Sequence, residues 1–303
     1  MGTSIQTREL VINWHITEAC NYGCKYCYSA WEKQKGCRDV VKDIQASRDL
    51  IRKVYDFFRP GNTENPLYRE MQWQSVRLNF AGGEPLLYAR HMPDLMRFAH
   101  ETGFNTSLIT NGSRLTTTLL NELAPYLSWL GLSLDSVDAQ ANQRIGRMDQ
   151  RGNQLDVIRL ANDIKAVRNA YPALRLKVNT VVNAVNAHED FSSLIRMLSP
   201  EKWKILRMLP VVNNNLEIDD RMFAEFVMRH RAFQKISRVE DNSEMLESYI
   251  MIDPLGRFYQ NGQDTRKNGY QYSSPILEEG ASTAFSGMRF STSRYTARYS
   301  EVA

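Results

Sequence analysis

The amino-acid sequence predicts an α/β protein, built as a partial (β/α)6 barrel of parallel strands with a C-terminal appendage. Short apolar runs of strand length alternate with segments of helical period over the first two thirds of the chain. Gly, Asn or Asp separates these segments, and the alternation ends after Leu209. Because alternating strands and helices form right-handed crossover units, we expect the strands to be parallel.

The expected strands are apolar runs that end at polar or glycine residues: Leu10 to Thr17, Val76 to Ala81, Thr106 to Thr110, Leu130 to Asp135, Leu174 to Val182 and Trp203 to Leu209. The expected helices each carry an apolar stripe that can cover a sheet: Asp43 to Phe58, Pro93 to Glu101, Thr117 to Tyr126, Leu155 to Asn169, Phe191 to Leu198 and Arg221 to Lys235. The segment Arg59 to Trp73 contains Pro, Gly and Asn and is expected to be a surface loop.

We divide the chain into a barrel core over residues 1–211 and an appendage over residues 212–303. In the appendage, the stretch SYIMIDPLGRFYQNG predicts a hairpin around Pro254 and Gly256. From about Ala281 the chain has little periodicity, which predicts a flexible tail. This tail is either a flap that closes the active site or an idle end.

Composition and charge exclude several classes of protein. The 303 residues are 43% hydrophobic and 24% charged, values that exclude collagen-like, disordered and disulfide-scaffold proteins. A formal net charge of +4 is too small for a general binder of DNA, RNA or membrane surfaces. No apolar run reaches the roughly 18 residues that span a bilayer, and no signal peptide is recognisable. We therefore expect a cytoplasmic protein without a membrane partner.

Three of the four cysteines form a compact motif directly after the first strand. Cys20, Cys24 and Cys27 have the spacing CxxxCxxC, which indicates metal ligands in a reducing compartment. A structural zinc needs four ligands, and the candidates for the fourth are Cys37 and His15. An iron–sulfur cluster held by three cysteines instead leaves one iron open for a small molecule. Cys37 is expected to be an ordinary free thiol.

This motif, with Tyr26 before the third cysteine, resembles the signature of radical S-adenosylmethionine (radical SAM) enzymes. The resemblance implies one 4Fe-4S cluster on the three cysteines, with S-adenosyl-L-methionine bound at the open iron. The second strand ends in AGGEPLL, which matches the family loop that meets the methionine amino group. Together with TNGS, SLDS and the loop QRIGR, it implies these cofactor-binding residues: Tyr26, Gly82, Gly83, Glu84, Asn111, Ser133, Asp135 and Arg147.

Longer stretches resemble the viperin family, and specifically its prokaryotic members. They include VINWHITEACNYGCKYCY, LNFAGGEP, SLDSVDAQANQRIGR, LKVNTVVNAVNAHED, SPEKWKILRML, ESYIMIDPLGRF and FSGMRF, in the same order across nearly the whole chain. The resemblance implies a nucleotide dehydratase in antiviral defence. Such an enzyme converts a ribonucleoside triphosphate (CTP, UTP or GTP) to its 3′-deoxy-3′,4′-didehydro form. A 5′-deoxyadenosyl radical abstracts the 4′ hydrogen, so no side chain is assigned as a catalytic acid or base.

Cations on neighbouring strands fit a triphosphate. Lys177 and Asn179 alternate on one expected strand, and Lys202 and Lys204 alternate on the next, so each pair shares a face. The viperin pattern implies the following substrate contacts: Asn13, Lys53, Lys177, Asn179, Lys202, Lys204 and Tyr249. Of these, Asn13 is implied to contact the ribose and Tyr249 the base. Arg52 is the alternative to Lys53.

The expected partners are the nucleotide and a flavodoxin-type or ferredoxin-type electron donor, and the expected state is a monomer. Animal viperins carry an N-terminal membrane helix and a C-terminal Trp. Because the first expected strand begins near residue 9 and the sequence ends in SEVA, we expect neither feature here. One alternative is a radical SAM enzyme that acts on another nucleotide or on a peptide, although such enzymes often carry further cysteines and none follows Cys37. Another alternative is an iron–sulfur or zinc protein that serves as a non-catalytic scaffold.

Overall fold

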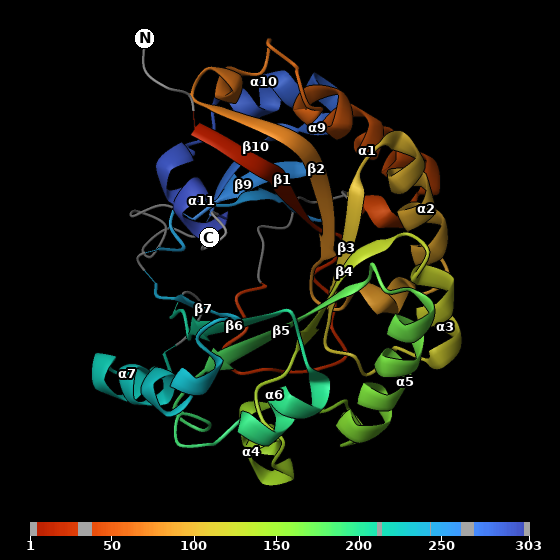
Figure 1. The fold of residues 1–303 in the computed structure, drawn as a ribbon. Coiled ribbons are helices and arrows are strands. Elements are labelled where there is room, and N and C mark those ends of the chain that lie inside the picture. Colours follow the sequence, from red (N-terminus) through yellow and green to blue (C-terminus); the bar gives the residue numbers. More distant parts are fainter. Residues whose placement is uncertain (1–4, 30–37, 211–213, 243, 262–269, 300–303) are drawn as a thin grey trace. The chain divides into compact units, whose positions relative to one another are not determined.

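A computed structural model describes residues 5–29, 38–210, 214–242, 244–261 and 270–299 (Figure 1). The chain divides into two compact units. Unit 1 comprises Met1–Glu18, Trp31–Ser107 and Ser243–Ala303, and unit 2 comprises Ala19–Ala30 and Leu108–Asn242. This division by compactness does not test the predicted boundary after residue 211, which stays a prediction.

Unit 1 has the strand order β10-β9-β8-β1-β2-β3, and β3 continues into unit 2. Its strands are β1 (Ile5–His15), β2 (Met71–Ala81), β3 (Asn105–Thr110), β8 (Ile250–Ile252), β9 (Arg257–Gln260) and β10 (Gln271–Pro275). Its α-helices are α1 (Ile44–Phe58), α2 (Met92–Thr102), α9 (Ile276–Glu279), α10 (Ala281–Ser286) and α11 (Thr292–Tyr299). Short 3-10 helices occupy Val40–Lys42, Pro66–Arg69 and Pro85–Tyr88. β1 pairs in parallel with both β2 and β8, whereas β9 is antiparallel to β8 and to β10.

Unit 2 continues the strand order as β3-β4-β5-β6-β7. Its further strands are β4 (Leu127–Ser133), β5 (Arg175–Val182), β6 (Lys202–Arg207) and β7 (Ser237–Glu240), with parallel pairing from β4 to β7. Its helices are α3 (Thr117–Leu123), α4 (Ala139–Ile145), α5 (Val157–Ala170), α6 (Ser192–Leu198) and α7 (Asp220–Arg229), followed by a 3-10 turn at Arg231–Phe233. Helices α3 and α5 lie together beside β4 and β5 (Figure 1).

Acidic or hydroxyl side chains cap the N-termini of α1, α3, α4, α5 and α7. Asp43 accepts hydrogen bonds from the first-turn N–H groups of α1, and Thr116, Asp138, Asp156 and Asp219 cap α3, α4, α5 and α7 in the same way. Such caps satisfy N–H groups that have no partner within the helix. The local sequence therefore determines where these helices begin.

The predicted strands and helices are found, with shifts at their ends. β1 and β2 begin earlier than expected, at Ile5 and Met71, so Trp73 belongs to a strand and not to the predicted loop. The hairpin around Pro254 and Gly256 is present as β8 and β9. The short elements α4, β7 and β10 were not predicted, since none has a long periodic pattern.

Within the tail predicted from about Ala281, residues 281–299 are not without structure, since they contain the helices α10 and α11, and its closing of the active site stays a prediction. The Phe285 ring packs against Phe57 and Phe58 of α1, and the Tyr295 hydroxyl accepts the backbone N–H of Val11 at 2.6 Å. Tyr295 is fully buried. A few large aromatic side chains thus anchor a segment whose average composition is polar.

The second half of β1 buries three apolar side chains on one face and carries Asn13 on the other. Leu10, Ile12 and Trp14 are at most 1% exposed, whereas Asn13 on the opposite face is half-buried. Within the described ranges, no helix is both long enough and apolar enough to span a membrane.

Candidate active site

The cysteine loop of unit 2 is attached to the end of helix α4. The N–H groups of Gly23 and Lys25 donate to the backbone oxygens of Gly146 and Ile145 at 3.1 and 2.9 Å. Gly146 has a φ of +91°, and a Cβ atom there would lie 2.2 Å from the Gly23 oxygen. This close approach requires glycine, because any side chain would push the loop away.

None of the three cysteines of the motif is in a disulfide among the described residues, and the electrostatic coupling of Cys24 with Cys20 and Cys27 places them near one another. Burial raises the pKa of Cys24 to about 12, and the neighbouring Asp135, Cys27 and Cys20 charges raise it further, while Arg147 opposes them. Thiols that repel one another as anions are a fitting donor set for a cationic iron centre, which binds thiolates. In the described residues, no group of three His, Cys, Asp or Glu side chains is already arranged closely enough to hold one metal ion. Cys37 lies outside the described residues.

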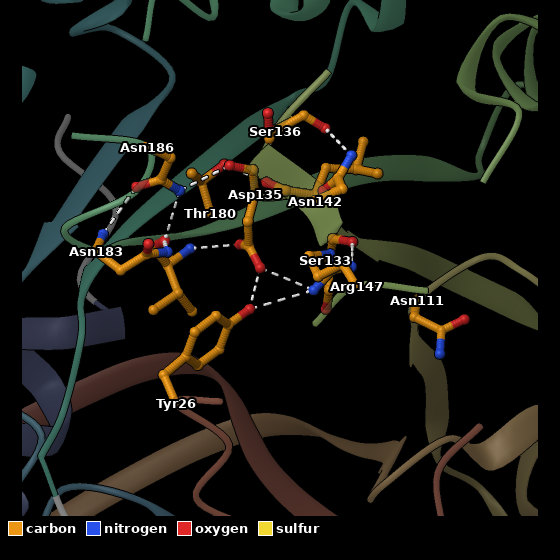
Figure 2. A network of polar contacts seen from close by, with 12 residues as sticks. Tyr26, Asn111, Ser133, Asp135, Ser136, Asn142, Arg147, Thr180, Asn183 and Asn186 are labelled. Carbon is orange, nitrogen blue, oxygen red and sulfur yellow. Dashed lines mark hydrogen bonds and ion pairs between the residues drawn. The ribbon is translucent and has the colours of Figure 1, made fainter. Parts of the chain in front are cut away.

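A buried polar network joins this loop to the ends of β4 and β5 (Figure 2). Asp135 Oδ2 accepts from the Tyr26 hydroxyl and from Arg147 Nη1, the latter at 2.8 Å. Asp135 Oδ1 accepts the backbone N–H of Val181 at 2.8 Å, and Arg147 also donates to the backbone oxygen of Ser133. Asp135 is 1% exposed and Arg147 is 7% exposed, so this ion pair is withdrawn from water.

The network keeps the Tyr26 phenol protonated and also holds its side chain in place. Burial, with the Asp135 carboxylate alongside, raises the pKa of Tyr26 well above its usual range, so its phenol stays neutral and donates. Asn111 comes from the end of β3, and its Nδ2 donates to Asn21 Oδ1 at 3.1 Å and to Cys20 Sγ at 3.8 Å. The structure thus brings together five residues predicted from sequence: Tyr26, Asn111, Ser133, Asp135 and Arg147.

The GGEP loop of unit 1 turns tightly against the end of β1. The N–H of Gly83 donates to the Thr17 oxygen at 2.7 Å, and a Cβ atom on Gly82 would lie 2.7 Å from the same oxygen. Glu84 is fully buried, and its carboxylate accepts the N–H of Leu86 at 2.9 Å. Glycine is therefore required by the backbone approach, and the glutamate begins the following 3-10 turn.

The predicted cations of β5 and β6 lie side by side in unit 2. Lys177 is the register partner of Lys202, and Asn179 is the partner of Lys204. Lys177 lies over Gly131 of β4, where a Cβ atom would come within 3.2 Å of its Cε. The aliphatic part of Lys177 therefore occupies the space that a side chain at position 131 would need.

Sequence reasoning missed two charged residues on β7. Arg238 is the register partner of Lys204, and the Glu240 carboxylate lies 2.6 Å from the Lys204 Nζ. Glu240 is only 1% exposed. Four residues on β7 are too few for a recognisable strand pattern, although the alternation of Arg238 and Glu240 was visible.

The other predicted substrate residues belong to unit 1. Asn13 is hydrogen-bonded to Asn79 of β2, a buried polar residue that sequence reasoning also missed. Tyr249 lies under the Arg298 guanidinium, 3.8 Å from the ring centroid. Lys53 is exposed on α1, and its predicted alternative Arg52 pairs with Asp49 at 2.7 Å.

Comparison with known proteins identifies the family. The model of the radical SAM superfamily matches residues 14–169. A protein of Psychrobacter lutiphocae named S-adenosylmethionine-dependent nucleotide dehydratase is 39% identical over 299 residues, covering 99% of this chain and 97% of that protein. The chain belongs to this radical SAM family.

Further relatives agree with the assignment. A dehydratase of the same name from Pseudoalteromonas ulvae is 39% identical and covers 99% of this chain and 95% of its own length. A Danio rerio relative with that name is 27% identical over 91% of this chain and 73% of its own. The predicted membership of a viperin-like radical SAM family is confirmed.

Solved structures confirm the predicted fold. The peptide-bound and AdoMet-bound anSMEcpe structure has a TM-score of 0.64 at 16% identity, covering 92% of this chain and 80% of that chain. Streptococcus suis SuiB bound to S-adenosylmethionine has a TM-score of 0.61 at 15% identity, covering 97% of this chain and 68% of that chain. At this identity the likeness concerns the α/β partial-barrel fold alone. The family implies that this radical SAM enzyme uses S-adenosylmethionine and a 4Fe-4S cluster.

Proposed function

We propose that this radical SAM nucleotide dehydratase converts a ribonucleoside triphosphate, CTP, UTP or GTP, to its 3′-deoxy-3′,4′-didehydro form in antiviral defence. The observation that carries the choice of a triphosphate is the row of cations in register across three strands, Lys177 with Lys202 and Lys204 with Arg238. Glu240 compensates the charge of Lys204, and the accumulation of the other cations in this row favours an anionic ligand.

Cys20, Cys24 and Cys27 are proposed to hold the 4Fe-4S cluster. When bound, that cluster supplies the electron that cleaves S-adenosylmethionine to methionine and a 5′-deoxyadenosyl radical. The backbone of Gly82 and Gly83, together with Glu84, is proposed to meet the methionine amino group. Arg147 is proposed to bind the methionine carboxylate, with the carboxylate of Asp135 keeping its guanidinium in place.

The remaining assigned side chains are proposed to position the nucleotide. Lys177, Lys202 and Lys204 bind the triphosphate, while Asn179 and Asn13 contact the ribose region. The substrate loses its 4′ hydrogen atom, and one further electron and one proton then release the 3′ hydroxyl as water. The chain's role is orientation and exclusion of water, which can supply a large share of a rate enhancement.

An anaerobic assay of each triphosphate with S-adenosylmethionine and dithionite tests this function. The expected result is a product lighter than its substrate by one water, formed together with 5′-deoxyadenosine. If none of the three triphosphates is consumed while 5′-deoxyadenosine forms with another nucleotide or a peptide, the substrate assignment is wrong. The same assay with flavodoxin or ferredoxin in place of dithionite tests the proposed donor.

The cluster assignment has its own test, which needs no substrate. A Cys37→Ser protein is expected to retain its iron after anaerobic reconstitution, whereas Cys24→Ser is expected to lose it. Loss of iron from Cys37→Ser would show that Cys37 is a ligand. We further propose that the enzyme is cytoplasmic and that it is a monomer. Light scattering of the reconstituted protein tests whether it is a monomer.

A further inference from the structure

We infer that Asn79 and Ser107 are positioning residues that determine how the side-chain amide of Asn13 faces the nucleotide. This inference rests on the proposed function, in which Asn13 contacts the ribose. All three residues belong to unit 1, as does Ile250, whose backbone oxygen ends the chain of hydrogen bonds. Neither Asn79 nor Ser107 was expected from the sequence to have a functional role.

The side chains form a continuous line of hydrogen bonds. The Ser107 hydroxyl donates to Asn79 Oδ1 at 2.7 Å, and Asn79 Nδ2 donates to Asn13 Oδ1 at 2.8 Å. Asn13 Nδ2 then donates to the backbone oxygen of Ile250 at 3.3 Å. Asn13 and Asn79 are register partners on β1 and β2, so their side chains emerge from the same face of the sheet.

Only one direction of donation satisfies the whole line. The backbone oxygen of Ile250 can accept but cannot donate, so the Asn13 atom that faces it must be the amide nitrogen. Asn13 Oδ1 then faces Asn79 and needs the Asn79 nitrogen as donor. Asn79 Oδ1 in turn needs the Ser107 hydroxyl. Reversing any one amide would place two acceptors, or two donors, in contact.

Because the line is buried, breaking one of its hydrogen bonds or reversing one of its amides costs free energy. Asn79 and Ser107 are each 3% exposed, so water cannot replace a missing partner. Asn13 is only half-buried, so of the three side chains in the line it is the one that remains partly accessible from outside the core. Among the described residues, its amide retains one N–H and one oxygen lone pair for a ribose hydroxyl.

The consequence is recognition of a ribose hydroxyl by a pre-oriented amide. An amide that could rotate by half a turn would exchange its oxygen and nitrogen positions and lose the matched contact in part of the population. Removing the Ser107 hydroxyl releases Asn79, and a released Asn79 no longer holds Asn13. Ser107 therefore acts on the nucleotide through two other residues.

Equilibrium dialysis tests the inference without turnover. Reconstituted enzyme is kept anaerobic with S-adenosylmethionine and no reductant, and the affinities for CTP, UTP and GTP are compared with those for their 2′-deoxy and 3′-deoxy analogues. Ser107→Ala is expected to weaken ribonucleotide binding about tenfold, the effect of one lost hydrogen bond. Binding of the analogue that lacks the contacted hydroxyl is expected to change little.

Two further variants give the test its controls. Ser107→Thr keeps a hydroxyl and is expected to keep the discrimination between ribonucleotide and deoxynucleotide. Ser75→Ala removes a serine of the same unit that donates to the backbone oxygen of Arg8 at 3.2 Å, and it is expected to bind like the wild type. If Ser107→Ala weakens all nucleotides equally, its role is only structural and the inference is wrong. If the wild type binds none of the three ribonucleotides, the proposed function fails and the inference fails with it.

Discussion

Two cationic side chains of unit 2, Lys204 and Arg147, form ion pairs with buried carboxylates. Lys204 of β6 pairs with Glu240 of β7 at 2.6 Å, and Arg147 pairs with Asp135 at 2.8 Å. A buried ion pair adds little to stability as a whole, but removing one partner leaves the other charge uncompensated. The cations of the site are therefore coupled to the folding of unit 2.

A substitution at Lys204 is expected to affect stability as well as binding. Lys204→Met leaves the buried Glu240 carboxylate without its cation and is expected to lower the free energy of unfolding by about 3 kcal/mol. The double variant Lys204→Met with Glu240→Gln is expected to recover most of this loss, but not the affinity for nucleotide. Urea unfolding and equilibrium dialysis measure the two effects. Equal stability of the single and double variants would contradict the coupling.

The pH dependence of folding is expected to depend on His15. Burial lowers the pKa of His15 from 6.5 to about 3, so the folded protein keeps it neutral where the unfolded chain binds a proton. Its contribution to stability is complete above about pH 6.5 and decreases as the pH falls towards 3. Between pH 7 and pH 5 this amounts to about 2 kcal/mol.

Urea unfolding of wild type and His15→Gln at pH 7, 6 and 5 measures this contribution. The variant is expected to lose less stability than the wild type over that range. His188→Gln, at an exposed histidine, is the matched control and is expected to follow the wild type. Parallel curves for wild type and His15→Gln would contradict the assignment.

At the scale of elements, the cysteine loop is held by backbone hydrogen bonds to the C-terminal end of helix α4. The backbone bonds from Gly23 and Lys25 to the end of α4 hold the loop, and Tyr26 ties it to Asp135. Helix α4 is only seven residues long, from Ala139 to Ile145. It ends at Gly146, where the two backbones meet.

Gly146→Ala is expected to reduce retention of the cluster. The added Cβ would lie 2.2 Å from the Gly23 oxygen, so the loop must move away and lose its hydrogen bond to α4. Gly152→Ala is the matched control, since Gly152 also has a positive φ, +81°, but a Cβ there meets no atom within 4 Å. Iron content after anaerobic reconstitution is the measurement. Equal iron in both variants would show that the contact does not hold the loop.

At the scale of the whole molecule, the C-terminal segment is part of the core of unit 1. Phe285 packs against Phe58 and Phe258, and Tyr295 accepts a hydrogen bond from β1. The segment therefore completes the burial of Phe58, which precedes Phe285 by 227 positions in the sequence. Any role as a lid over the nucleotide would come in addition to this packing.

Truncation after Gly280 is expected to destabilise the protein even without ligands. It exposes Phe58 and removes the acceptor of the Val11 N–H. Loss of one large core side chain such as Phe285 costs about 3–5 kcal/mol, and the lost hydrogen bond adds to this cost. Tyr295→Phe isolates the second change and is expected to cost about 1–3 kcal/mol. Thermal unfolding measures both. A truncated protein that unfolds at the wild-type temperature would show that the segment does not support the core.

The sequence by itself determined the long periodic elements, the parallel α/β class, the cysteine motif and the set of polar residues at strand ends. These features are local, because caps, alternation and motif spacing depend on residues close together in the chain. Only the tertiary structure decided which polar residues meet: Asp135 with Tyr26 and Arg147, Lys204 with Glu240, and Asn13 with Asn79 and Ser107. It also decided that the polar tail packs as helices, since one buried Tyr295 and one buried Phe285 find partners in strands and helices far away in the sequence. Strand register and long-range packing bring these groups together. Both depend on residues far apart in the sequence, so no short stretch of residues predicts them.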